Sequence, residues 1–216
     1  MTEENYNCQT SQTLLRSQFP GKGKFKIPII PKFQERPGDF DDLLLIGFDK
    51  THLEDQNHLD RMVHFFLYDY RFEQVWKNPD NDMEKLSRYR AVLSPDFSMY
   101  LEMAPVMQLC NVFRNRWCGA YWASKGLRVI PTVNWGDEST FDFCFEGIEK
   151  GSVWQFLPTW RPNTATARIK KSGSWQDTTR CCGVLSRRKS SAITRRFQRC
   201  REILFMWTMN AVPGGI

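Results

Sequence analysis

The sequence has few of the residues and none of the patterns that mark the commonest functional classes. Its three histidines, His52, His58 and His64, recur at a spacing that fits neither one face of a helix nor the alternation of a strand. A histidine metal site is therefore not expected. The chain also lacks a Walker loop, a nucleophile elbow, a GxGxxG fingerprint, a zinc finger and a helix-turn-helix pattern. These absences exclude the common enzymes and DNA-binding modules, but not the uncommon ones.

Long apolar runs are missing as well. No stretch approaches the roughly 18 apolar residues that would span a bilayer, and residues 1–17 lack the apolar segment of a signal peptide. The four cysteines before residue 154 (Cys8, Cys110, Cys118 and Cys144) form no CxxC pair or Cys/His cluster. Free thiols are typical of a reducing compartment, so the sequence predicts a cytoplasmic protein.

Acidic residues are scarce in one part of the chain only. Residues 154–216 contain 12 Lys/Arg and 2 Asp/Glu, a net charge of +10, whereas residues 1–153 carry 18 and 22, a net charge of −4. The basic part also shows no sustained period of a helix or a strand. It is nevertheless rich in Trp, Phe and Cys, unlike a disordered basic arm.

The unique codons of Trp and Met allow a test of the reading frame. Moved back by one base, Trp154 and Gln155 together read alanine, Trp207 and Thr208 read aspartate, and residues 151 onward can read Gly-Ser-Val-Val-Ala-Val-Ser, a run suited to a buried strand. Residues 174–194 can likewise restore to an amphipathic helix, a proline and another apolar strand. We interpret residues 154–216 as an irregular, frameshifted tail without a native fold. The alternatives are a basic arm that binds nucleic acid or an acidic partner, and a fused foreign segment. If the tail is out of frame, its charge predicts non-specific polyanion binding only.

The remaining residues have the organisation of one domain. Residues 1–41 form an extended leader in which Pro20, Pro28, Pro31 and Pro37 exclude long helices. Residues 42–153 alternate apolar runs with helical periods. The expected strands are 43–48, 63–68, 90–93 and 127–133; the expected helical pieces are near 72–76, 83–86, 105–121 and 141–145. Strands that alternate with helices predict parallel βαβ units, and hence an α/β fold that is an incomplete (βα) barrel or a small open parallel sheet.

Several successive motifs carry a family resemblance. Residues 68–73 (YDYRFE), 94–100 (SPDFSMY), 111–116 (NVFRNR) and 130–137 (IPTVNWGD) occur in this order. The chain from about Phe19 onward resembles the family catalogued as domain of unknown function 4417. This resemblance implies a protein of plasmids, phages or other mobile elements of Gram-positive bacteria. It implies no activity.

Polar residues at the predicted strand ends are the candidate site, because ligands of parallel α/β folds bind at the carboxyl ends of the strands. The catalytic candidates are Asp69, Asp96 and Asp137; the ligand-binding candidates are Arg71, Arg116, Asn134 and Glu138; Glu73, Arg114 and Asn115 lie near enough in sequence to join them. Carboxylates, Asn and Arg could together hold Mg²⁺ and a phosphate. Helix caps and ion pairs are the structural alternative for each residue.

Two function classes follow from the sequence. In the first, intact relatives are enzymes that bind or process a phosphorylated or nucleotide ligand at the strand-end carboxylates. In the second, they are non-enzymatic accessory proteins of a mobile element that bind a host or replication partner. Convergence of the strand-end residues favours the enzyme, and their burial in separate ion pairs favours the binding protein.

Overall fold

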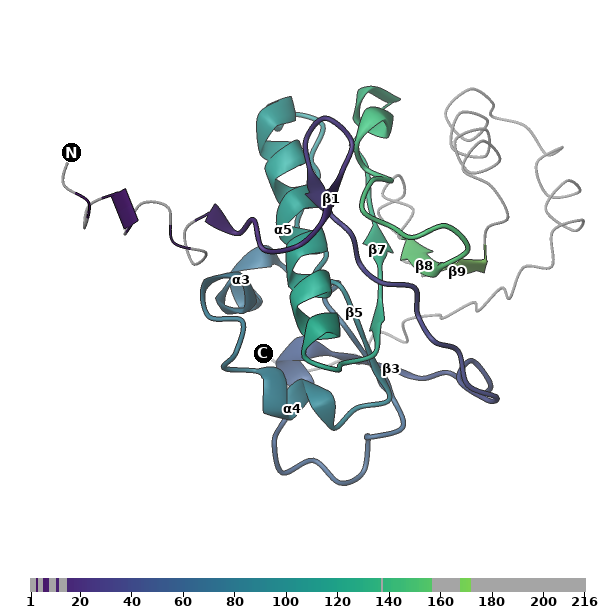
Figure 1. Ribbon diagram of the computed structural model, residues 1–216. Coiled ribbons are helices and arrows are strands. Elements are labelled where there is room, and N and C mark those ends of the chain that lie inside the picture. The colour runs from purple at the N-terminus through teal and green to yellow at the C-terminus, as the bar shows by residue number, and fades with distance from the viewer. Residues whose placement is uncertain are drawn as a thin grey trace, which may run out of the picture.

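Parallel strands form the centre of the fold (Figure 1). The computed structural model describes residues 3, 6, 7, 11, 15–136, 138–156 and 168–171. Strands β3 (Leu45–Gly47), β4 (Met62–His64), β5 (Ala91–Leu93) and β6 (Val129–Ile130) pair in parallel, each beside its predecessor in the chain. The α/β fold class and the parallel pairing of these segments are therefore confirmed.

Three further strands extend this arrangement. Strand β7 (Thr132–Val133) pairs in parallel with β8 (Val153–Phe156), which pairs antiparallel with β9 (Arg168–Lys171). The expected strand 127–133 is divided into β6 and β7 at Pro131, because proline has no amide hydrogen for a strand ladder. The Pro131 carbonyl still accepts a 2.9 Å hydrogen bond from the Gln155 amide. A four-stranded parallel sheet with its strands in chain order fits both predicted forms, the incomplete (βα) barrel and the small open parallel sheet.

Helices lie between the strands at three of the four places where the sequence predicts them, and near 141–145 a 3₁₀ turn over 138–142 stands in place of the expected helix. Helices α3 (Gln74–Lys77) and α4 (Met83–Ser87) lie between β4 and β5, and α5 (Pro105–Ser124) lies between β5 and β6. Pro105 suits the first turn of α5, because the amides of that turn have no partner within the helix and proline has no amide hydrogen. Gly126, with φ of +93°, adopts the left-handed conformation that commonly follows a helix end. Short 3₁₀ turns are η1 (Phe48–Lys50), η2 (Asp69–Arg71) and η3 (Glu138–Asp142). Among the described residues, no helix is long and apolar enough to cross a membrane.

Alternate strand residues build two hydrophobic layers. On one face, Ile46, Val63, Val92 and Val129 belong to the cluster that includes Trp117 and Trp122 of α5. The other face has its own cluster, in which strand and leader side chains pack together: Met62, Ala91, Leu93, Ile130, Val153, Phe33 and Phe40. The sheet is therefore covered on one side by α5 and on the other by the leader.

The leader is an arm that contributes to the core. The small hairpin of β1 (Gly21–Lys22) and β2 (Ile27–Pro28) lies beside α5 (Figure 1), and Ile30, just after it, is completely buried. Before the hairpin, the Arg16 guanidinium lies 4.5 Å from the Trp76 ring and 4.1 Å from the Trp117 ring. It also donates a 2.9 Å hydrogen bond to the Trp76 carbonyl. Of the tail, residues 157–167 and 172–216 lie outside the described residues.

Candidate functional site at the carboxyl edge of the sheet

Polar side chains gather where the parallel strands end. Strand β3 leads into Asp49, β4 ends in His64 and leads into Asp69 and Arg71, and β5 leads into Asp96 and Ser98. Because parallel strands end at the same edge of a sheet, these loops meet there. We call Asp49, His64, Asp69, Arg71, Asp96 and Ser98 the carboxyl-edge site.

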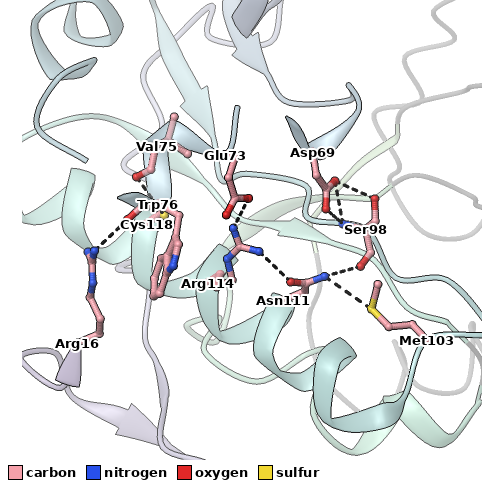
Figure 2. Close-up of polar contacts among 10 residues, drawn as sticks. All are labelled: Arg16, Asp69, Glu73, Val75, Trp76, Ser98, Met103, Asn111, Arg114 and Cys118. Atoms are coloured by element: carbon pink, nitrogen blue, oxygen red, sulfur yellow. Dashed lines mark hydrogen bonds and ion pairs between the residues drawn. The ribbon is translucent and has the colours of Figure 1, made fainter. Parts of the chain in front are cut away.

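Two carboxyl groups interact at the centre of this site. Asp69 accepts hydrogen bonds from the Ser98 amide, 3.2 Å from each carboxylate oxygen, and from Ser98 Oγ at 2.8 Å (Figure 2). The Asp96 Oδ1 atom is enclosed and has no hydrogen-bond partner, although other parts of the residue remain accessible. Burial, and then the negative charge of Asp69, raise the pKa of Asp96 to about 7. Asp96 can therefore gain or lose a proton near neutral pH.

A second polar group surrounds Asp49. Its Oδ2 accepts a 2.7 Å hydrogen bond from Arg71, which also donates from Nε to the Tyr70 hydroxyl at 3.4 Å. Burial of the His64 imidazole lowers its pKa to about 4, and the nearby Asp49 charge opposes this shift only in part. His64 Nδ1 accepts a hydrogen bond from the Phe66 amide at 3.2 Å, which places the proton of the neutral ring on Nε2. His64 is therefore a neutral donor at this edge.

Exposed aromatic rings flank the carboxylates. Tyr68 and Tyr70 are 69% and 75% exposed, and their rings lie nearly parallel, 6.0 Å apart between centroids with an interplanar angle of 11°. Tyr100 is also exposed, and its hydroxyl lies 3.0 Å from Ser98 Oγ. Rings that remain in solvent beside charged groups can stack on a planar ligand.

The other predicted site residues have partners within the protein. The Arg116 guanidinium is buried and donates hydrogen bonds to the carbonyls of Glu146, Thr132 and Cys144 at 2.9, 2.8 and 2.7 Å. It also binds Asn115 Oδ1, and burial lowers its pKa to about 10. Arg116 thus ties α5 to the segment that follows β7.

Three more of the candidates surround α5. Arg114 pairs with Glu73 and donates to Asn111 Oδ1 at 3.2 Å (Figure 2). Asn115 Nδ2 donates to the Pro95 carbonyl at 2.6 Å. These contacts connect α5 to the loops after β4 and β5.

The remaining candidates follow β7. Asn134 is buried and donates from Nδ2 to the Phe97 carbonyl at 2.7 Å. Asp137 lies outside the described residues, and so does the side chain of Glu138, the first residue of η3. In the part of the chain that the structure describes, no three His, Cys, Asp or Glu side chains are grouped so that they could hold a metal ion. Asp69, Asp96 and Arg71 are thus the predicted residues that the described carboxyl-edge site contains.

Asp49, His64 and Ser98 were not predicted as members of this site. Asp49 could have been found, because it directly follows the first expected strand as Asp96 follows a later one. The spacing of His64 from the other histidines argues only against a metal site, and its place at the end of β4 depends on where that strand ends in the fold. Ser98 has no sequence signal of its own.

Comparison with known proteins shows a family of unknown function and similarity to two phage proteins. A family model described as "Domain of unknown function (DUF4417)" matches residues 19–156. The "Gene 1 protein" of Mycobacterium phage L5 is 42% identical over 140 residues, which cover 64% of this chain and 59% of that protein. The "Gene 1 protein" of Mycobacterium phage D29 is 40% identical over 140 residues, which cover 64% of this chain and 50% of that protein. No solved structure matches. The chain therefore spans between half and three fifths of the length of these relatives.

Proposed function

Because the chain belongs to the family described as Domain of unknown function (DUF4417), which names no reaction, we propose a function from the chemistry of the carboxyl-edge site. The site binds a nucleotide or a related phosphorylated ligand, and Asp96 exchanges a proton with that ligand. The single observation that carries the proposal is the enclosed Asp96 carboxyl next to Asp69, with its pKa raised to about 7. A group with this pKa is suited to general acid or base catalysis at neutral pH.

The neighbouring residues fit the parts of a nucleotide. Tyr68 and Tyr70 offer exposed rings on which a base can stack. Arg71 is partly exposed and can bind a phosphate in place of Asp49, because a guanidinium grips phosphate with two parallel hydrogen bonds. Asp69 is held in place by Ser98 and remains an acceptor for a sugar hydroxyl. The three chemical parts of the ligand would thus meet three different kinds of side chain.

Calorimetric titration with a panel of nucleoside monophosphates tests this proposal. We expect an affinity that changes between pH 6 and pH 8, and a smaller change in Asp96→Asn, where only the titration of the ligand phosphate, with a pKa of about 6, remains. Tyr70→Ala should weaken binding roughly 5-fold or more, the usual effect of a lost stacking ring. Tyr6→Ala is the matched control, because Tyr6 is similarly exposed but lies in the leader. Absence of nucleotide binding at millimolar concentrations, or an unchanged pH dependence in Asp96→Asn, would contradict the proposal.

A second candidate function rests on a different observation. Leu101, Val106 and Met107 are each more than half exposed, next to the exposed Tyr100 and around the start of α5. Exposed apolar side chains that cluster in this way are typical of a protein-binding surface. An accessory protein that binds a host or replication partner would use this surface. Leu101→Asp would then abolish partner binding while nucleotide titrations stay unchanged, and the reverse result would favour the enzyme.

We also infer that the chain is read in a shifted frame after Val153. The Gln155 side chain is completely buried in β8, and neither its Oε1 nor its Nε2 has a hydrogen-bond partner among the described residues. A buried carboxamide without partners is costly, whereas the alanine of the restored frame needs none. The family match supports the same position, because it ends at residue 156. The intact relative would carry another sequence from residue 154 onward.

The nucleotide sequence around the codon of Val153 tests the frame directly. A one-base restoration that opens a frame continuing the family pattern is expected. In the protein, Gln155→Ala should raise the urea midpoint of unfolding, because it removes two unpaired polar atoms from the core. Gln34→Ala is the control, since Gln34 is an exposed residue of the leader. A restored frame that reaches a stop codon at once, or a clear loss of stability in Gln155→Ala, would exclude this inference.

A further inference from the structure

A hollow lies at the opposite edge of the sheet from the carboxyl-edge site. Its volume is about 590 Å³, and it is lined by the residues that lead into β5 and β6, by residues 36–39 of the leader and by Leu59 and Asp60 before β4. Ligand pockets for small molecules typically have volumes of roughly 300–1,000 Å³. We call it the amino-edge pocket, because it lies where these strands begin.

Arginines are the characteristic side chains of this pocket. Arg36, Arg88, Arg90 and Arg128 line it, against the two carboxylates of Asp39 and Asp60. An arginine also stands directly before three of the four parallel strands: Arg61 before β4, Arg90 before β5 and Arg128 before β6. Positive charge is thus brought to one edge of the sheet by the fold itself.

Only part of this positive charge is neutralised. Arg128 pairs with Asp39, and the hydrogen bond from Arg128 holds the pKa of Asp39 below its usual value, so this carboxylate stays ionised. Arg88 donates instead to main-chain carbonyls, including that of Asp55 at 3.0 Å, and Arg90 donates to the Asp39 carbonyl at 3.3 Å. Within the described ranges, no carboxylate lies within the 4.0 Å of an ion pair from Arg36, Arg88 or Arg90, although the charge of Arg36 adds to the lowering of the Asp39 pKa.

We propose that the amino-edge pocket is an anion site that binds a small phosphorylated ligand, separate from the carboxyl-edge site. Guanidinium groups without carboxylate partners are well suited to bind phosphate oxygens, which they contact in pairs. The main-chain carbonyl of Asp39, itself a lining residue, holds the Arg90 side chain in place, so less conformational freedom is lost on binding. A ligand with two linked phosphates presents enough oxygens to contact several of these arginines at once.

Titration of the full chain with inorganic pyrophosphate tests the site. We expect a saturable site whose affinity falls at least tenfold in Arg36→Glu and in Arg90→Glu. Lys77→Glu is the matched control, since it makes the same charge change at an exposed residue outside the pocket and should alter the affinity less than twofold. Arg36→Gln provides a variant without charge reversal, and thermal melts check that each variant is folded. Equal effects of Arg36→Glu and Lys77→Glu would overturn the proposal, because they would mean general charge attraction.

Two further arms separate this site from other sources of phosphate and from the proposed function. Binding of a short DNA duplex that is sensitive to Arg36→Glu, without binding of pyrophosphate, would show a nucleic-acid surface and overturn the small-ligand proposal. Asp96→Asn and Arg71→Ala should leave pyrophosphate binding unchanged. If nucleotide binding at the carboxyl edge fails while this result holds, only the proposed function is lost.

Discussion

Replacing Asp96 by asparagine should change the stability of the protein in opposite directions at low and high pH. The pKa of Asp96 is raised from 3.8 to about 7, so the folded protein binds its proton more tightly than the unfolded chain does. Ionising Asp96 therefore costs more free energy in the folded protein than in the unfolded chain. This loss of stability is absent below the pKa of the unfolded chain, grows as the pH rises, and is complete above about pH 7. Asparagine has the shape of the protonated acid at every pH and avoids this loss of stability.

The size of the effect follows from the shift. Roughly three pKa units correspond to about 4 kcal/mol of unfolding free energy, which wild type loses between about pH 4 and pH 7. Against this, the asparagine amide must find hydrogen-bond partners where Asp96 Oδ1 already has none, at a cost of about 1–3 kcal/mol. Asp96→Asn should therefore be less stable than wild type at pH 4.5 and about 1–3 kcal/mol more stable at pH 8.

Urea unfolding followed by tryptophan fluorescence at several pH values between 4.5 and 8.5 measures this difference. The difference between Asp96→Asn and wild type should change sign within that range. Asp69→Asn is a useful companion, because removal of the neighbouring charge should move the wild-type transition to lower pH without abolishing it. If the unfolding free energies of Asp96→Asn and wild type differ by the same amount at all pH values, the pKa of Asp96 is not raised. The chemical basis of the proposed function would then be wrong.

The remaining predictions concern the core, the leader and the tail. Arg116→Leu should destabilise the fold by about 2–5 kcal/mol in urea unfolding, since the buried carbonyls of Glu146 and Cys144 lose their donor while Thr132 keeps Asn115; a variant within about 1 kcal/mol of wild type would mean that these bonds contribute little. Arg16→Ala should cost about 1–2 kcal/mol through the lost cation–π contacts, and limited proteolysis should then cleave the leader faster, whereas an unchanged rate would exclude the anchor. For the tail, a salt titration with unrelated DNA sequences of equal length should give affinities that fall together as salt rises, because non-specific binding comes from counterion release. More than about tenfold discrimination between those sequences would indicate selected base contacts.

Much of the fold could be predicted because its signals are local. The apolar runs before Ser94 and before Asn134 are short and bounded by turn residues, so they read as strands, and the helical periods between them require parallel pairing. Pro131 was visible as well, but its effect depends on whether the strand ladder needs an amide hydrogen at that position. Whether the ladder needs an amide hydrogen at residue 131 depends on the partner strand, and the residues from 127 to 133 alone do not reveal it.

The site was predicted less completely, because its contacts join distant segments. Nothing near Arg116 in the sequence reveals that its acceptors belong to residues such as Cys144 and Glu146, about 30 positions later. The burial of Asp96 likewise depends on loops that meet only in the fold. The arginine before each of three strands, in contrast, was readable from the sequence and was missed, because only the carboxyl ends of the strands were considered.

The order of the strands has a consequence for synthesis of the protein on the ribosome. Each of the strands β4, β5 and β6 pairs with the strand made just before it, so the sheet can grow from β3 as the chain emerges. Contacts between sequence neighbours also form faster than distant ones. If the reading frame shifts after residue 153, strands β3 to β6 have already been synthesised and can already be paired when the altered sequence emerges. Such a gene could lose the end of its product and still yield a recognisable nucleus of the family fold.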